Sequence, residues 1–374
     1  MRFDGCKLTM TLEPQFPMVH FQEEKTEIDT LSAQEIPTLR ATEVKPKLDR
    51  FIVRQIKKRE GLDFETNVKE KYPDYFSDEE HFSLKYKMEI CETEKINAEK
   101  QVVEQKRDEI FFCKGKSSHV VFLSPKVTII CFHAKLRKEI ESAIEDFFIV
   151  TNFGGKQRKG FGSFLPKETN FNQNLNEDEK KEIAKKLKEE TGADFCYEMS
   201  FLPLERVKLY RKMFRNMNTF YKAMKSGINI KKDFASPYIY VYMQKKGIDN
   251  EKYVRALLGT AEQISYTYPK KLDIEIKKTG TKKQSDGQEI KLERVPSPIY
   301  FKVIKNTVFI TAYPVLEEIY ETQYEFSVKE GENKGKIRIP AKDEFDMGDF
   351  LKEYVQYYNA KFKGCDVKVG EICD

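Results

Sequence analysis

The amino-acid sequence predicts an α+β fold of two domains with mostly antiparallel sheets. Its 374 residues are enough for two compact cores, and the chain is 40% hydrophobic and 13% aromatic, which is typical of a folded protein. Segments with helical and strand periodicity are mixed without the regular alternation of a parallel sheet. We place the domains at 1–165 and 166–374, because a polar link separates two runs of predicted elements.

The first half of the chain combines strand patterns with two helices. Apolar and polar residues alternate over 7–12, as in a half-buried strand. From 134 to 149 the apolar residues recur at helical spacing, so this helix should pack on the sheet. Another helix is predicted at 43–55, with Pro46 near its first turn. Further strands are predicted at 84–90, 108–113, 119–124 and 127–132.

The second half repeats this mixture. The polar, glycine-bearing segment 278–291 indicates a mobile loop. Two similar domains in tandem would fit the pattern, although no short repeat is visible. The predicted helices are 177–190, 204–225, a segment near 251–265 and 346–359, and the predicted strands are 237–243, 271–277, 298–304 and 307–313.

Charge and cysteine content exclude several classes of protein. The 66 Lys and Arg against 61 Asp and Glu leave a formal charge of only +5, so any polyanion-binding surface must be local. The seven cysteines form no CxxC pair, and their odd number argues against a disulfide framework. No apolar run approaches the roughly 18 residues of a membrane span, and the N-terminus lacks a signal-peptide core. We expect a soluble, cytoplasmic protein without a cofactor.

The segment "NFGGKQRKGFGSF" (152–164) is the strongest local signal. Glycines let the backbone approach a ligand, and clustered N–H groups beside cations suit phosphate oxygens. The segment is not a Walker A loop or a dinucleotide fingerprint, because the predicted helix precedes it. A helix C-cap followed by a flexible turn is the structural alternative. The glycines are Gly154, Gly155, Gly160 and Gly162, and the cations are Lys156, Arg158 and Lys159.

Three stretches resemble one protein family. "FFIVTNFGGKQRKGFGSF" (147–164) is similar to the helix and glycine-rich loop of the RAMP superfamily of CRISPR-associated proteins, and particularly of the first subunit of the Cmr (type III-B) effector complex. "LRATEVKPKLDRF" (39–51) resembles the family's entry into its first helix. "ERVPSPIYFKVI" (293–304) resembles its Arg-x-x-Ser-Pro strand. The three stretches follow the family's order along the chain.

The resemblance implies a fold, a ligand and a set of residues. Members have ferredoxin-like (RRM-like) domains that hold guide RNA by its backbone inside multi-subunit complexes of antiviral defence. Near the first helix, the matching positions are Arg40, Lys45 and Arg50. In the loop, they are Gly154, Gly155, Arg158, Lys159, Gly160, Phe161 and Gly162.

Residues 204–232 form the densest basic region, with nine Lys or Arg against one acid. Cations at 208, 211, 212 and 215 would share one helix face and could follow phosphates, whereas Met213 and Met217 would face a core. An ordinary solvated helix face is the alternative. We predict RNA contacts for Lys208, Arg211 and Arg215. The interleaved aromatic residues are more often core than stacking platforms.

Catalytic residues are harder to find. Metal-free RNA cleavage needs an acid and a base, for which some RAMP relatives use histidine, and the chain has four: His20, His81, His119 and His133. A single histidine at a strand end is usually structural, and the acidic segment at 77–81 is expected to face water rather than a metal. We therefore expect no catalytic or metal-binding residues, and we leave Asp49 without a role.

Three hypotheses follow from these observations. The first is a noncatalytic, guide-RNA-binding subunit of a type III CRISPR effector, with target RNA as a further candidate ligand and other RAMP subunits as partners. The second is a metal-independent, repeat-processing endoribonuclease of the same superfamily. The third is a scaffold whose basic surfaces bind acidic proteins.

Overall fold

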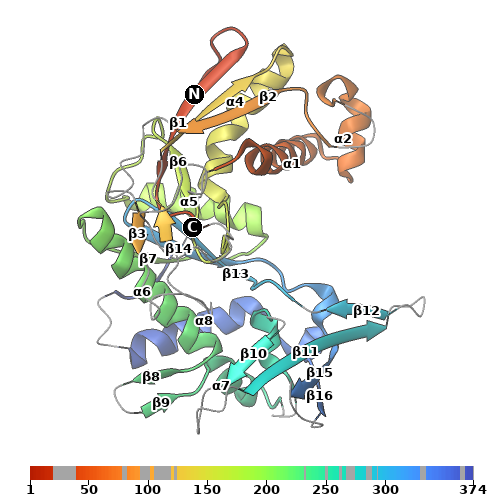
Figure 1. Ribbon diagram of the computed structural model, residues 1–374, viewed down its shortest axis with the longest axis vertical. Coiled ribbons are helices and arrows are strands. Elements are labelled where there is room, and N and C mark those ends of the chain that lie inside the picture. Colours follow the sequence, from red (N-terminus) through yellow and green to blue (C-terminus); the bar gives the residue numbers. More distant parts are fainter. Residues whose placement is uncertain are drawn as a thin grey trace.

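The computed structural model describes most of the chain in fourteen stretches. Within it, helices and mostly antiparallel sheets build an α+β fold, as predicted (Figure 1). The described residues are 1–19, 39–77, 82–92, 102–104, 119–121, 124–230, 233–248, 252–260, 263–266, 274–283, 289–292, 294–328, 334–362 and 367–373.

The first sheet has four antiparallel strands in the order β2-β5-β1-β6. Numbered along the domain, this is the order 2-3-1-4 of a ferredoxin-like fold, in which two strand–helix–strand units interlock. The two helices of these units lie on the same face of the sheet. The elements are β1 (Lys7–Pro14), α1 (Ala41–Glu60), β2 (Lys87–Glu92), β5 (Pro125–Ile130), α4 (Ala134–Val150) and β6 (Phe164–Pro166).

The second sheet repeats this topology. Its order is β13-β14-β7-β17, again 2-3-1-4 along the chain, and all its pairings are antiparallel. Two ferredoxin-like domains in tandem are therefore confirmed. The elements are β7 (Tyr197–Ser200), α6 (Arg206–Lys225), β13 (Ile299–Ile304), β14 (Thr307–Ala312), α8 (Met347–Lys361) and β17 (Gly370–Glu371).

Other elements are added to these two units. Among them, α5 (Glu177–Thr191) packs between α4 and β14, and a third antiparallel sheet extends the second half. That sheet consists of β10 (Gln263–Tyr266), β11 (Ile274–Lys283), β12 (Glu289–Leu292), β15 (Gln323–Val328) and β16 (Lys334–Arg338). The rest are α2 (Glu65–Lys71), α7 (Tyr238–Lys245), the pair β3 (Val102–Glu104) and β4 (His119–Val121), and the pair β8 (Ile228–Ile230) and β9 (Asp233–Ala235).

Local sequence explains where several helices begin and end. Helix α5 starts with a capping box in which Asn176 and Glu179 satisfy each other's backbone N–H groups. Helices α1 and α5 end at Gly61 and Gly192, whose φ angles of 62° and 76° suit glycine. Pro46 lies inside α1, deeper than the first turn in which it was expected.

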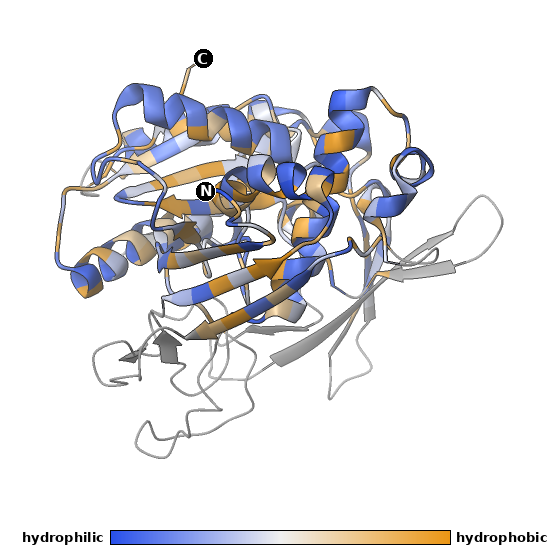
Figure 2. Ribbon diagram, turned by 90° about the horizontal axis from the view of Figure 1, so that it is seen from above, coloured by the Kyte–Doolittle hydropathy of each residue, from blue (hydrophilic) through white to orange (hydrophobic). Residues whose placement is uncertain are grey.

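The two sheets differ in how their faces are covered. Along β1, exposed and buried residues alternate in the first four positions, whereas every residue of β13 and β14 is buried. Phe301 and Val303 share a core with α6 and α8, while Tyr300 and Phe309 share the other core with α4 and α5. The second sheet is thus enclosed between two helical layers. In Figure 2 the strands change between hydrophilic and hydrophobic colours along their length.

Three element predictions were wrong. Residues 237–243 form most of α7 instead of a strand, because Tyr238, Ile239, Tyr242 and Met243 bury one helical face. The helix near 251–265 is a short 3-10 turn at Val254–Leu258 followed by β10. The loop at 278–291 is largely the hairpin of β11 and β12. The strand predicted at 108–113 lies outside the described residues.

Candidate nucleic-acid interface

The glycine-rich segment joins the two domains. It connects α4 to β6, and Asn152 and Ser163 form a bridge at its base. Its middle pairs with the edge strand of the second sheet, where the Phe301 N–H donates to the Arg158 carbonyl over 3.0 Å. The Ser163 hydroxyl donates to the Val303 carbonyl over 2.6 Å. The loop therefore covers an edge that would otherwise expose backbone groups.

Steric constraints explain three of the four glycines. Gly154, Gly160 and Gly162 have φ angles of 75°, 84° and 69°, in the left-handed region that other residues rarely adopt. A Cβ on Gly162 would lie 1.9 Å from the Phe153 carbonyl oxygen, and one on Gly154 would lie 2.7 Å from the Val19 oxygen. The glycines therefore allow close backbone packing.

The glycine amides have acceptors within the chain. The Gly154 N–H donates to the Glu43 carboxylate over 2.6 Å. The Gly155, Gly160 and Gly162 N–H groups donate to backbone carbonyls over 2.5, 3.1 and 2.9 Å. The sequence had suggested that these four N–H groups are free to bind phosphate. In the structure, each of them donates a hydrogen bond within the chain. Whether the side chains of the loop contact RNA stays a prediction.

Those side chains lie against aromatic rings. Arg158 donates to the Ser297 carbonyl and lies 4.6 Å from the centre of the Tyr313 ring, and burial lowers its pKa. Lys159 lies 5.0 Å from the Tyr221 ring, and Lys156 5.8 Å from the Phe161 ring. Phe161 is itself 0% exposed, so it is a core residue and cannot stack on a base.

The cations predicted near the first helix separate into two kinds. Arg40 and Arg50 are exposed. The Lys45 ammonium instead donates to Asp49 over 2.7 Å and to the Leu84 carbonyl over 3.0 Å, and it lies 4.3 Å from the Tyr86 ring. Asp49 is 3% exposed, and burial raises its pKa. Asp49 is therefore a structural partner of Lys45.

Two lysines at the domain junction were missed from the sequence. The Lys47 ammonium donates to the Asn152 carbonyl over 3.0 Å and to Gln157 over 2.9 Å, which ties α1 to the loop. Lys302 is 0% exposed and caps the end of α4 by donating to the Phe148 and Thr151 carbonyls, each over 2.8 Å. Burial, and then the charge of Lys47, hold the pKa of Lys302 well below its usual value. A single lysine inside the apolar run "IYFKVI" was the available signal.

The basic helix presents its cations as predicted. Lys208, Arg211 and Arg215 of α6 are exposed, and Lys212 is half-buried beside them. On the opposite side, Met213, Phe214, Met217 and Phe220 are buried in the second core. The helix is thus held rigidly while one face offers positive charge to solvent.

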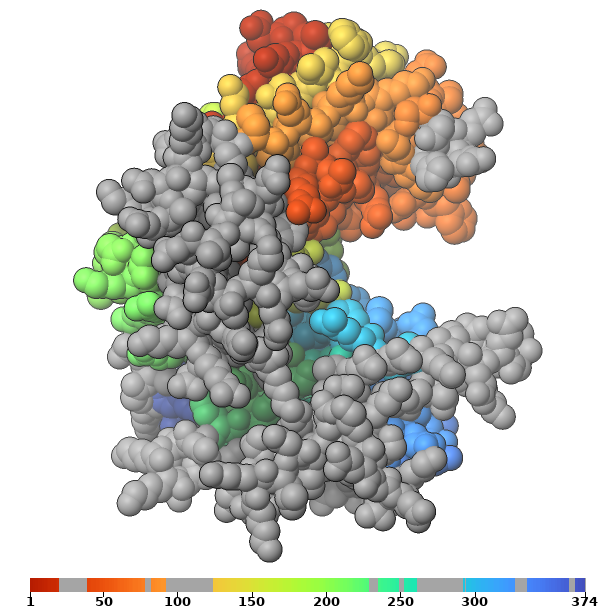
Figure 3. Space-filling view, in the orientation of Figure 1, coloured from red at the N-terminus to blue at the C-terminus, as the bar shows by residue number. Residues whose placement is uncertain are grey.

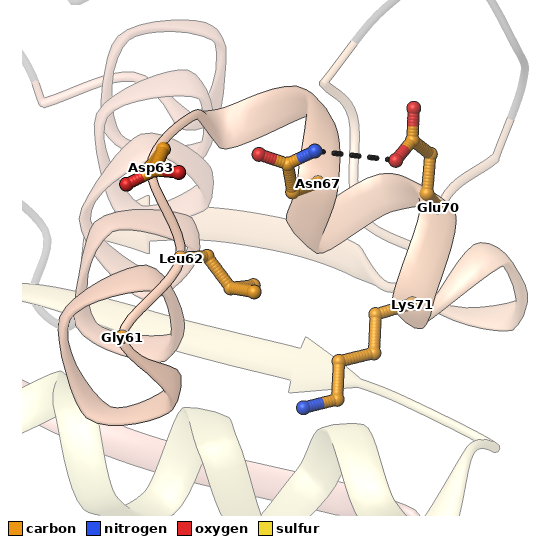
Figure 4. A pocket seen from close by; sticks show the side chains of 6 residues that line it. All are labelled: Gly61, Leu62, Asp63, Asn67, Glu70 and Lys71. Carbon is orange, nitrogen blue, oxygen red and sulfur yellow. Dashed lines mark hydrogen bonds between the residues drawn. The ribbon is translucent and has the colours of Figure 1, made fainter.

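The surface is hollowed between the two domains. Figure 3 shows a deep recess between the part formed by α1 and α2 and the part formed by the second domain. A second, shallow depression lies between the end of α1 and α2 (Figure 4). Its polar groups already pair, since Asn67 donates to Glu70 and Lys71 pairs with Glu60. We therefore assign no ligand to that depression.

One of the four histidines lies in the described part with its side chain, and it has a structural role. His133 caps α4 by accepting the Leu136 N–H over 3.2 Å, and its ring meets that of Tyr75 edge-on at 5.1 Å. His20, His81 and the His119 side chain lie outside the described part. Within that part, no group of three His, Cys, Asp or Glu residues could hold a metal ion, and no helix is long and apolar enough to cross a membrane.

Two ferredoxin-like domains in contact through a glycine-rich loop, with an exposed basic helix in the second domain, form the arrangement that the resemblance to the RAMP class implies. Comparison with family models is more specific: the Cmr1 N-terminal domain matches residues 5–228, and the Cmr1 C-terminal domain matches residues 160–370. The chain therefore belongs to the Cmr1 family, subunits of type III-B CRISPR effector complexes. This confirms the resemblance seen in the sequence.

The solved structures that are similar to this chain include one of a Cmr1 protein. The crystal structure of Cmr1 from Pyrococcus furiosus in its apo form is similar over 98% of both chains, with 12% sequence identity and a TM-score of 0.43. No curated protein matched the sequence.

Proposed function

We propose that this chain is a noncatalytic subunit that binds guide RNA within a type III-B effector complex. The observation that carries the proposal is the exposed face of α6, where Lys208, Arg211 and Arg215 stand on a helix fixed by its buried side. Cations spaced three and four residues apart on one helix face can follow a line of phosphates. Partners in the complex would be other RAMP subunits.

In this proposal, the glycine-rich loop fixes the domains relative to each other. Its backbone is occupied by hydrogen bonds with β13, with Glu43 of α1 and with the carbonyls of Pro17 and Val19. Its contribution to RNA binding would therefore come from side chains such as Lys156, and the exposed Arg40 and Arg50 would contribute further. The two functional domains would be 1–165, which carries the loop, and 166–374, which carries α6. Binding is then mostly electrostatic and depends on salt.

The test replaces the three α6 cations together, as Lys208→Gln, Arg211→Gln and Arg215→Gln. Three lost phosphate contacts should lower the slope of log Kd against log salt by about 2 for single-stranded RNA. A matched control replaces Lys245, Lys246 and Lys342, which are exposed but paired with acids. Binding is measured by fluorescence anisotropy with CRISPR-repeat RNA. An equal slope in both triple variants would contradict the proposal.

A further inference from the structure

Within the described residues, helices pack on one face of the first sheet, and no described helix packs on the other. Its register places residues of three strands in rows across this face: Lys7, Ile130 and Lys87 in one row, and Thr9, Thr128 and Glu89 in the next. Lys7, Thr9, Lys87 and Glu89 are exposed, and Ile130 and Thr128 are half-buried. Two lysines therefore flank an isoleucine at one end of an open sheet.

Phe132 continues this face beyond the end of β5. It is 81% exposed, whereas Cys131 is 0% exposed on the helical side, so alternation puts Phe132 on the same side as Ile130. The backbone here is fixed. The Cys131 N–H donates to the Cys6 carbonyl over 2.9 Å, and the Arg137 guanidinium donates to the Cys131 and Phe132 carbonyls, both over 3.1 Å. The exposed phenyl ring is thus carried by a backbone segment that these three hydrogen bonds hold in place.

The cations at this end of the sheet are Lys7 and Lys87, in the row of Ile130, and Glu89 in the next row is the one acid of the two rows. Lys135 and Lys138, in the first turns of α4, are also exposed. The face is otherwise polar, so it lacks the contiguous apolar area that a protein partner would bury. An exposed ring beside several cations instead matches single-stranded nucleic acid, whose bases stack and whose phosphates attract lysine.

We propose that the open face of the first sheet is a second binding site, which takes single-stranded nucleic acid. One base stacks on Phe132, and the adjoining phosphates lie along Lys7 and Lys87. The site lies on the first domain and is distinct from the α6 face. It therefore goes beyond the proposed function and does not require it.

The experiment separates stacking from charge. Binding of fluorescein-labelled oligouridylate is compared with binding of labelled dextran sulfate, a polyanion without bases. Phe132→Ala should weaken RNA binding roughly five- to one-hundred-fold, leave dextran sulfate binding unchanged and leave the salt slope unchanged. Lys7→Gln with Lys87→Gln should weaken both ligands and lower the RNA salt slope by about 1.4. Phe132→Trp should restore RNA binding, and Leu202→Ala, at another exposed apolar residue, should have no effect.

Photo-crosslinking locates the contact. An oligouridylate with 5-iodouridine should crosslink to the peptide that contains Phe132, in the wild type and in the α6 triple variant. Loss of RNA binding in Phe132→Ala but not in the α6 triple variant would support the site at Phe132 and reject RNA binding by the α6 face. Equal loss for both ligands, loss in Phe132→Trp, or crosslinks confined to other peptides would overturn this site.

Discussion

The third strands of the two sheets occupy the same place in the same topology but have different surroundings. In the first sheet, Thr128 of β5 faces the open side, whereas Phe309 of β14 in the second sheet faces the core shared with α4 and α5. The difference comes from α5, which packs on β14 of the second sheet, whereas α4 packs on the helical face of the first sheet and on α5. Both faces of the second sheet are buried, whereas in the described part of the chain one face of the first sheet carries exposed and half-buried residues.

This difference explains why the repeat was hard to see in the sequence. A sheet with one covered face alternates in polarity, and a sheet with both faces covered is apolar throughout. The run "KLTMTL" follows the first rule, while "IYFKVI" and "TVFITA" follow the second. Two domains of the same fold therefore carry different patterns.

The largest expected effect tests this contrast directly. Phe309→Ala should lower the free energy of unfolding by roughly 3–5 kcal/mol, because it opens a cavity between two helical layers. Thr128→Ala, at the corresponding strand of the first sheet, should change it by less than about 0.5 kcal/mol. Urea unfolding followed by circular dichroism measures both. Similar losses at the two positions would show that the first sheet is covered as well.

The glycine-rich loop between the two sheets should be nearly as sensitive to substitution. Gly162→Ala should cost roughly 3 kcal/mol or more, since its Cβ would meet the Phe153 carbonyl at 1.9 Å. Gly61→Ala is a matched control with a φ of +62° and no atom within 4 Å of the added Cβ, and it should cost about 1 kcal/mol. The difference in urea midpoint between the two variants isolates the clash. A tolerated Gly162→Ala would mean that the loop is not packed on the domain junction.

The smallest effect concerns the charge buried at the junction. The pKa of Lys302 is lowered in the folded protein, so between that pKa and the unfolded value of about 10.5 the unfolded chain binds more protons. The free energy of unfolding of the wild type should therefore rise with pH relative to Lys302→Met, by up to about 1.4 kcal/mol per pH unit, until pH reaches about 10.5. Denaturation at several pH values measures this difference. A difference that stays constant with pH would mean that Lys302 titrates normally.

The sequence predicted those features that depend on neighbours along the chain. The exposed and buried sides of α6 follow from helical spacing, and the limits of α5 follow from its cap residues. The aromatic run at α7 led to the wrong prediction of a strand, because residues that favour strands can also bury one face of a helix. The contacts of Lys302 were out of reach, since they join residues about 150 positions apart. The glycines were compatible with close packing and with ligand binding alike. The structure shows the close packing, and contact of the loop with RNA stays a prediction.

The most direct test of this account is amide hydrogen–deuterium exchange with and without CRISPR-repeat RNA. Because the glycine amides of 154–162 donate within the chain, they should exchange slowly in the free protein, as should β13 and β14. RNA should leave these segments unchanged and slow exchange around α6. Rapid exchange over 154–162 that RNA suppresses would contradict the account, because it would make the glycine backbone itself the binding element.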